Sequence, residues 1–151
     1  MQPHERLQQI RCSLNKMPGG VAEQAGVSRA AYYDLESDPT EIFMCVSLRD
    51  LQRICDCLGV DAFYLFTGAN RSESDVCYDF ESIAALIRQQ LKRSGETTVE
   101  FSDRVGWEIE PFLKDACEGW EWNVDCLRDL CSALGIRWEL ALPMSEAVKW
   151  R

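Results

Sequence analysis

The side chains with the most reactive chemistry in this sequence are eight cysteines and one histidine. Thiolates and imidazoles bind zinc when cysteines are paired at Cys-x-x-Cys spacing or lie near further histidines. The closest pair, Cys55 and Cys57, is two residues apart and would point to different faces of a helix, and His4 is distant in sequence. We therefore expect no metal site and no cofactor, and we expect most cysteines to be reduced and buried as small hydrophobic side chains.

Catalytic chemistry has little support in the residue pattern. A nucleophilic triad or a metal hydrolase normally needs a histidine in the site, and the single histidine lies at the extreme N-terminus. The run Pro18-Gly19-Gly20 lacks the glycine spacing and the Lys-Ser/Thr pair of a phosphate-binding loop. We expect a protein that is not an enzyme.

Composition and charge exclude further classes of protein. The chain has 151 residues, of which 46% are hydrophobic, and its net charge is −9. No apolar run approaches the eighteen residues of a membrane span, and the N-terminus does not resemble a secretory signal, so we expect a cytoplasmic protein without membrane contact. The acidic balance disfavours a general nucleic-acid coat protein, but it leaves room for a small, local DNA-reading face.

An internal repeat organises the chain. Residues 54–60 (Ile-Cys-Asp-Cys-Leu-Gly-Val) match residues 130–136 (Leu-Cys-Ser-Ala-Leu-Gly-Ile) at an offset of 76, and residues 21–27 match residues 101–107 at an offset of 80. The change of offset places the length differences in loops, where they are tolerated. We therefore predict two similar units with a polar linker and a short tail, over residues 1–66, 67–78, 79–142 and 143–151.

Each unit is predicted to be helical throughout. Apolar residues recur at spacings of three and four, as on one face of a helix, and no run alternates as a strand would. In the first unit Ser28 and Ser47 are placed to cap helices, and Gly26 is placed to end one. In the second unit helices are predicted over residues 80–93, 99–105, 108–117, 123–134 and 138–142.

The segment from Val21 to Arg29 carries the most specific pattern. It reads Val-Ala-Glu-Gln-Ala-Gly-Val-Ser-Arg, and Leu35-Glu36 and Leu58-Gly59-Val60 follow it. This pattern resembles the XRE family of lambda-repressor-like, Cro-type helix-turn-helix proteins, and residues 80–142 resemble it more faintly. The resemblance implies an all-α fold of two tandem five-helix domains, of which the first inserts its third helix into the major groove of DNA.

The outward face of that third helix holds the candidate DNA-binding residues. Tyr32 and Leu35 fall on the inward face, which leaves an outward face made of Ser28, Arg29, Ala30, Tyr33 and Asp34. An arginine can pair with guanine or hold a phosphate, while a serine or tyrosine can contact phosphates and base edges. Two further cations, Arg11 and Lys16, are expected to contact phosphates. Gly19 and Gly20 stand where the family often has a phosphate-binding Gln or Thr, and Asp34 adds a negative charge.

The second unit departs most from a DNA-binding surface. Its third helix would begin with Glu108 and Glu110, whose carboxylates repel phosphates. All five tryptophans lie within residues 67–151, and two of them, Trp120 and Trp122, sit among acidic residues and glycine. These two either close the core or anchor a protein interface, and we expect the unit to serve dimerisation or partner binding.

Two functions from different classes follow. The first is a DNA-binding transcriptional regulator of bacterial or phage type, acting as a homodimer on double-stranded DNA without catalysis. The second is an acidic protein-interaction module on a helix-turn-helix scaffold, which the net charge favours. A redox or metal sensor that uses the cysteines is a more remote third alternative.

Overall fold

The computed structural model describes residues 1–144, and this part of the chain is all-helical, as the periodicity predicts. The first half contains helices α1 (Pro3–Ser13), α2 (Pro18–Ala25), α3 (Arg29–Ser37), α4 (Glu41–Met44), α5 (Leu48–Leu58) and α6 (Ala62–Thr67). The second half contains helices α7 (Phe80–Ser94), α8 (Thr98–Val105), α9 (Glu110–Lys114) and α10 (Val124–Leu134), with 3₁₀ helices η1 (Ala116–Glu121) and η2 (Trp138–Ala141).

Short polar side chains set where most of these helices begin. The Ser28 hydroxyl accepts a hydrogen bond from the Ala31 backbone N–H, and the Ser47 hydroxyl accepts one from the Asp50 N–H, so both predicted caps are confirmed. In the second half Asp79, Thr97 and Asn123 cap α7, α8 and α10 in the same way. Gly26 ends α2 with a φ of +74°, a conformation that glycine adopts at little cost.

The helices differ from the prediction in number and in length: α4 gives the first half six helices where the resemblance implies five, and α9 is shorter than expected. The sequence predicts a helix over residues 108–117, but α9 spans only Glu110–Lys114 and the chain continues as the 3₁₀ helix η1. The Asp115 backbone is extended, and its carboxylate accepts a hydrogen bond from the Cys117 N–H, which starts the new turn. The spacing of apolar residues does not reveal this break, because apolar side chains are buried on both sides of it, Phe112 in α9 and Ala116 in η1.

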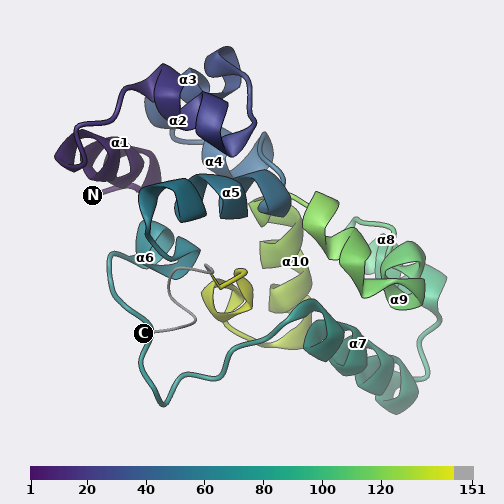
Figure 1. The fold of residues 1–151 in the computed structure, drawn as a ribbon. Coiled ribbons are helices and arrows are strands. Elements are labelled where there is room, and N and C mark those ends of the chain that lie inside the picture. The colour runs from purple at the N-terminus through teal and green to yellow at the C-terminus, as the bar shows by residue number, and fades with distance from the viewer. Residues whose placement is uncertain (145–151) are drawn as a thin grey trace.

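The two halves share one buried core. Figure 1 shows α1–α3 on one side and α7–α9 on the other, with α5, α6 and α10 between them. A single cluster of buried side chains runs from Leu7 to Leu142 and includes Leu48 and Leu51 of α5 and Leu127 of α10. Burial of this continuous apolar surface holds the two halves together, in addition to the chain segment that connects them.

The connecting segment, predicted as a linker over residues 67–78, is held to both halves. The Arg71 guanidinium pairs with the buried carboxylate of Asp61 at 2.6 Å and donates a hydrogen bond to the carbonyl of Leu142 at 2.8 Å. The Tyr78 N–H donates to the Leu140 carbonyl. The segment is therefore fixed to the rest of the molecule, although its polar composition is typical of a flexible linker. Of the predicted tail, residues 145–151 lie outside the described part of the chain.

Candidate nucleic-acid interface

The outward face of α3 is open to solvent. Tyr32 and Leu35 are buried beneath the helix, as their spacing predicts. The helix packs on α1, α2 and α4. Its opposite face is exposed, with Tyr33 at 51% of its full accessibility, and consists of Ser28, Arg29, Ala30, Tyr33 and Asp34. The predicted reading surface is therefore not covered by the second half.

The turn before α3 fixes where this face begins. Gly26 ends α2, Val27 packs half-buried against the core, and Ser28 follows as the cap residue of α3. The Ser28 hydroxyl oxygen accepts the Ala31 N–H at 3.1 Å, which leaves its own O–H free to donate. Ser28 can therefore cap the helix and contact a ligand at the same time.

Arg29 lies over the start of α2. A Cβ atom placed on Gly19 would be only 3.2 Å from the Nε atom of Arg29, so glycine at position 19 makes room for this side chain. The guanidinium thus stands beside the N-terminal end of α2, where unpaired backbone N–H groups carry partial positive charge. Both groups attract an anion, and they occupy the place where the family resemblance expected a Gln or Thr phosphate contact.

Arg29 also differs from the other cations of the first half. Six basic side chains lie within residues 1–66, all of them in the described part of the chain. Five make hydrogen bonds or ion pairs, namely Arg6, Arg11, Lys16, Arg49 and Arg53. Arg29 is the one for which the described residues provide neither, so its guanidinium remains available to a ligand.

Arg11 does not lie on the proposed surface, which corrects the expectation that it contacts phosphates. It is only 8% exposed, and its guanidinium forms a two-pronged pair with the buried carboxylate of Glu36, at 2.5 and 3.1 Å. The hydrogen bond to Glu36 raises the pKa of Arg11 above its ordinary value. This pair ties α1 to α3 and leaves Arg11 without a free edge for DNA.

Lys16 is half-buried and likewise makes a contact within the first half. Its ammonium donates a hydrogen bond to the carbonyl of Cys57 at 2.8 Å, near the C-terminal end of α5. Exposed carbonyls at a helix end carry partial negative charge, which this ammonium balances. Lys16 therefore joins the loop after α1 to α5, a contact between residues 41 apart that sequence spacing could not indicate.

The two tryptophans predicted to anchor a partner lie at the junction of the halves. Trp120 packs against Phe80 with ring centroids 5.0 Å apart, and Trp122 packs against Phe112 at 4.4 Å. The Trp122 carbonyl accepts a hydrogen bond from the Leu48 N–H of the first half. Both side chains are half-buried, so they close the core, which was one of the two alternatives for them.

The cysteines are less buried than predicted. Cys55, Cys126 and Cys131 are buried, whereas four are exposed, namely Cys12, Cys45, Cys77 and Cys117. Burial raises the pKa of the Cys126 and Cys131 thiols to about 12, so both are protonated at neutral pH and are poor nucleophiles. Among residues 1–144 no group of three or more potential metal ligands comes together.

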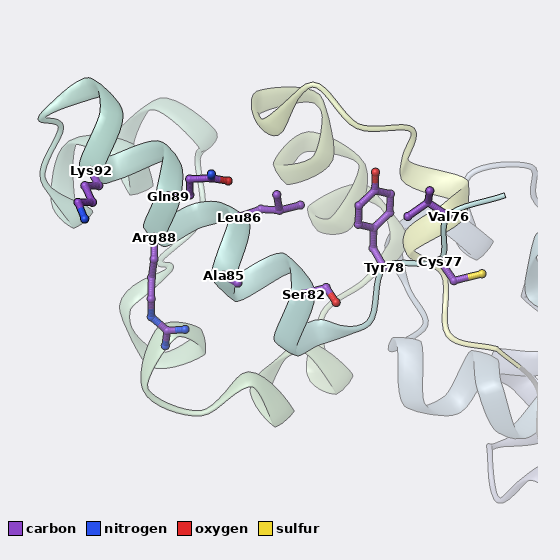
Figure 2. A pocket seen from close by; sticks show the side chains of 9 residues that line it. All are labelled: Val76, Cys77, Tyr78, Ser82, Ala85, Leu86, Arg88, Gln89 and Lys92. Carbon is purple, nitrogen blue, oxygen red and sulfur yellow. The ribbon is translucent and has the colours of Figure 1, made fainter. Parts of the chain in front are cut away.

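A second concave surface lies along α7, away from α3. Figure 2 shows its lining, with apolar Val76 and Leu86 beside Tyr78, and with Arg88 and Lys92 toward the far end of the helix. The hollow has a volume of about 640 Å³ and is shallow. The Arg88 guanidinium donates to the Leu113 carbonyl, so Lys92 is the freer of its two cations.

No helix of the described chain is both long and apolar enough to cross a bilayer. A comparison with protein-family models, with curated proteins and with solved structures returned no match to this chain.

Proposed function

We propose that this protein is a DNA-binding transcriptional regulator of the XRE-like helix-turn-helix type, acting in the cytoplasm and reading duplex DNA with α3. The observation that supports this most directly is Arg29, the cation of the first half that is left unpaired, on an exposed polar helix face. In a protein with a net charge of −9, cations tend to be paired with nearby acids. A free guanidinium beside a helix N-terminus suits an anionic ligand.

The mode of action is binding alone. The N-terminal end of α3 would lie in the major groove, where Arg29 can donate two hydrogen bonds to guanine or hold a phosphate. Ser28 would donate its free O–H to a phosphate or base edge, and Tyr33 would contact a phosphate or a thymine methyl group. Ala30, which is small and exposed, lets the backbone approach the bases. Occupation of the operator would then regulate transcription by excluding or recruiting other proteins.

The affinity of the α3 face for DNA should be modest, because few cations contribute to it. With Arg11 and Lys16 committed to internal contacts, Arg29 is the main cation left on the surface, and Asp34 lies on the same face. Each phosphate contact adds a counterion-release contribution to binding, so a small number of contacts gives a shallow dependence on salt. We expect the logarithm of affinity to fall with the logarithm of salt concentration, with a slope of about −1 to −3.

The test is selection from a random pool of duplex DNA by the purified chain, followed by fluorescence polarisation on the enriched sequence across salt concentrations. Arg29→Ala should weaken binding to that sequence by about 1–3 kcal/mol, or roughly 5–150-fold. Lys114→Ala is the matched control, because it removes an exposed cation from α9 and should change affinity little. Equal affinities of wild type and Arg29→Ala would refute the role of α3.

A protein-interaction module is the second candidate. The charge balance favours it, since both halves carry more acidic than basic side chains. The open hollow along α7 is also a surface that DNA reading does not use. Failure of the random pool to yield any enriched duplex, together with salt-sensitive binding of a basic peptide, would favour this candidate over the first.

A further inference from the structure

The contacts between the two halves are reciprocal. The sequence repeat makes α5 equivalent to α10 at an offset of 76, and the same offset relates α4 to η1 and α6 to η2. Across the junction α5 packs on η1, α10 packs on α4, and α6 packs on η2. Exchanging the two halves turns the α5–η1 contact into the α10–α4 contact and the reverse, and it leaves the α6–η2 contact unchanged. This is the pattern of an isologous, two-fold interface.

A hydrogen bond spans each of the two exchanged contacts, at positions that the offset of 76 does not relate residue by residue. The backbone N–H of Leu48, the first residue of α5, donates to the carbonyl of Trp122, just after η1, at 2.7 Å. The side-chain amide of Asn123, the cap residue of α10, donates to the carbonyl of Met44, the last residue of α4, at 3.0 Å. Each junction thus joins the start of the long central helix of one half to the end of the short helix of the other.

Aromatic side chains fill the centre of this junction. Phe43, Phe66 and Trp138 form a triangle of edge-to-face contacts with centroid distances between 5.3 and 6.4 Å. They come from α4 and α6 of the first half and from η2 of the second, and the guanidinium of Arg128 from α10 lies 4.9 Å from the Phe43 ring. Contacts of this kind are characteristic of permanent interfaces.

We infer that the chain is an intramolecular pseudodimer, in which the second half occupies the surface of α4, α5 and α6 that a second copy of the first half would use. The consequence for partners rests on the proposed function. One chain would bind DNA as a monomer, through a single reading helix, and would select a short and non-palindromic site. This replaces the homodimer on double-stranded DNA that the sequence suggests.

The asymmetry of the pseudodimer explains why only one half would read DNA. At an offset of 80, Arg29 corresponds to Ile109, which is fully buried, and Ser28 corresponds to Glu108. The second half therefore keeps the helices of the junction, but it has no arginine at the position of Arg29. In this arrangement it supplies a permanent dimerisation partner and no second reading helix.

The first experiment uses no DNA. Sedimentation or light scattering of the full chain should give a monomer of 17.3 kDa at every concentration used for binding. No tryptophan lies within residues 1–66 and four of the five lie within residues 79–142, so tryptophan fluorescence reports on the unfolding of the second half. Arg11→Ala, a change confined to the first half, should shift the tryptophan transition in urea together with the far-UV circular dichroism. A dimer, or a tryptophan transition that Arg11→Ala leaves in place, would overturn the pseudodimer.

A second variant tests the junction itself without removing a helix cap. Asn123→Asp keeps an oxygen that can cap α10 but replaces the amide that donates to Met44 with a carboxylate. Its urea midpoint should fall clearly below that of wild type. Thr97→Asp, at the exposed cap of α8, is the matched control and should retain the wild-type midpoint. Equal midpoints for the two variants would count against the proposed junction.

The stoichiometry of the chain on DNA distinguishes a failure of the pseudodimer from a failure of the proposed DNA binding. On a selected duplex, titration monitored by mass should give one chain per DNA, and the footprint should be short and one-sided. Two chains per duplex would overturn the pseudodimer as the binding unit and leave DNA reading intact. A monomer with coupled unfolding that binds no duplex would refute the DNA-binding proposal and leave the pseudodimer intact.

Discussion

The segment from α2 to α3 and its repeat from α8 to α9 begin alike and end differently. Both pass through a glycine with positive φ, Gly26 at +74° and Gly106 at +89°. Six residues after the glycine in each half, a buried aromatic side chain follows, Tyr32 in the first half and Phe112 in the second. Beyond it α3 continues to a total of nine residues, whereas α9 stops after five.

The difference of four residues is about one helical turn, and it equals the change of repeat offset from 80 to 76. A shorter helix presents less outward face, and the residues on it have changed character. The exposed Arg29 is replaced by the buried Ile109, while Glu108 and Glu110 are exposed. The comparison teaches that the turn and the core aromatic are kept in both halves, whereas an exposed arginine without a partner among the described residues lies on α3 and has no counterpart on α9.

The largest difference in stability between the halves is expected when two equivalent arginines are replaced. Arg11→Ala leaves the carboxylate of Glu36 buried and unpaired, so it should lower the free energy of unfolding by about 3–5 kcal/mol. Arg88 is its counterpart, because Arg11-x-x-Leu14 in the first half matches Arg88-x-x-Leu91 in the second. Arg88 is exposed and binds one carbonyl, so Arg88→Ala should cost about 1 kcal/mol or less. Urea unfolding of both variants measures the difference, and similar losses would show that the buried pair is not what holds α1 to α3.

The two turn glycines should behave alike. Gly26→Ala and Gly106→Ala each force a residue with a Cβ into the left-handed region, and each should cost about 1–2 kcal/mol. An added Cβ would meet no atom within 4 Å at either position, so the cost is conformational and not steric. Thermal unfolding compares them. A much smaller loss at Gly106 would mean that the second turn can relax and has lost its structural role.

The helix caps provide a smaller contrast. Ser28→Ala removes the hydroxyl that accepts the Ala31 N–H and should cost about 1 kcal/mol. Glu108 makes no comparable contact to cap α9, so Glu108→Ala should change stability by about 0.5 kcal/mol or less. Denaturant midpoints of the two variants give the comparison, and a cost at Glu108 as large as at Ser28 would contradict it.

The smallest effect concerns DNA binding by the second half. Replacing both Glu108 and Glu110 by Ala removes two exposed carboxylates, one of which pairs with Lys114 at 3.4 Å. Affinity for the selected duplex should stay the same or rise slightly, because less negative charge faces the phosphates. Fluorescence polarisation at two salt concentrations checks this. A marked loss of affinity would show that α9 takes part in binding.

Several features were accessible from the residues alone because they depend on near neighbours. Ser28 caps α3 through a residue three positions away, and Tyr32 and Leu35 share a face because of helical spacing. The shortening of α9 was missed, although the change of repeat offset placed four missing residues in that region. Helical periodicity could not show it, since Phe112 and Ala116 are buried on either side of the break.

The candidate surface was predicted only in part, for a reason that concerns long side chains. The outward positions of α3 follow from spacing, but Arg11 and Lys16 were expected on the same surface and lie elsewhere. An arginine or lysine can reach in many directions, and its partner is set by residues distant in sequence. Glu36 lies 25 positions from Arg11, and no local pattern predicts that the two meet.

The amino-acid sequence by itself determined the helical class, the turn at Gly26, the caps and the polar outward face of α3, because these depend on backbone conformation and on spacing along one helix. Only the tertiary structure decided which cations stay free and whether the repeats stand apart or share a core. Those outcomes depend on burial and on pairing across 25 to 79 positions of chain, and such contacts form only when the whole fold brings their partners together.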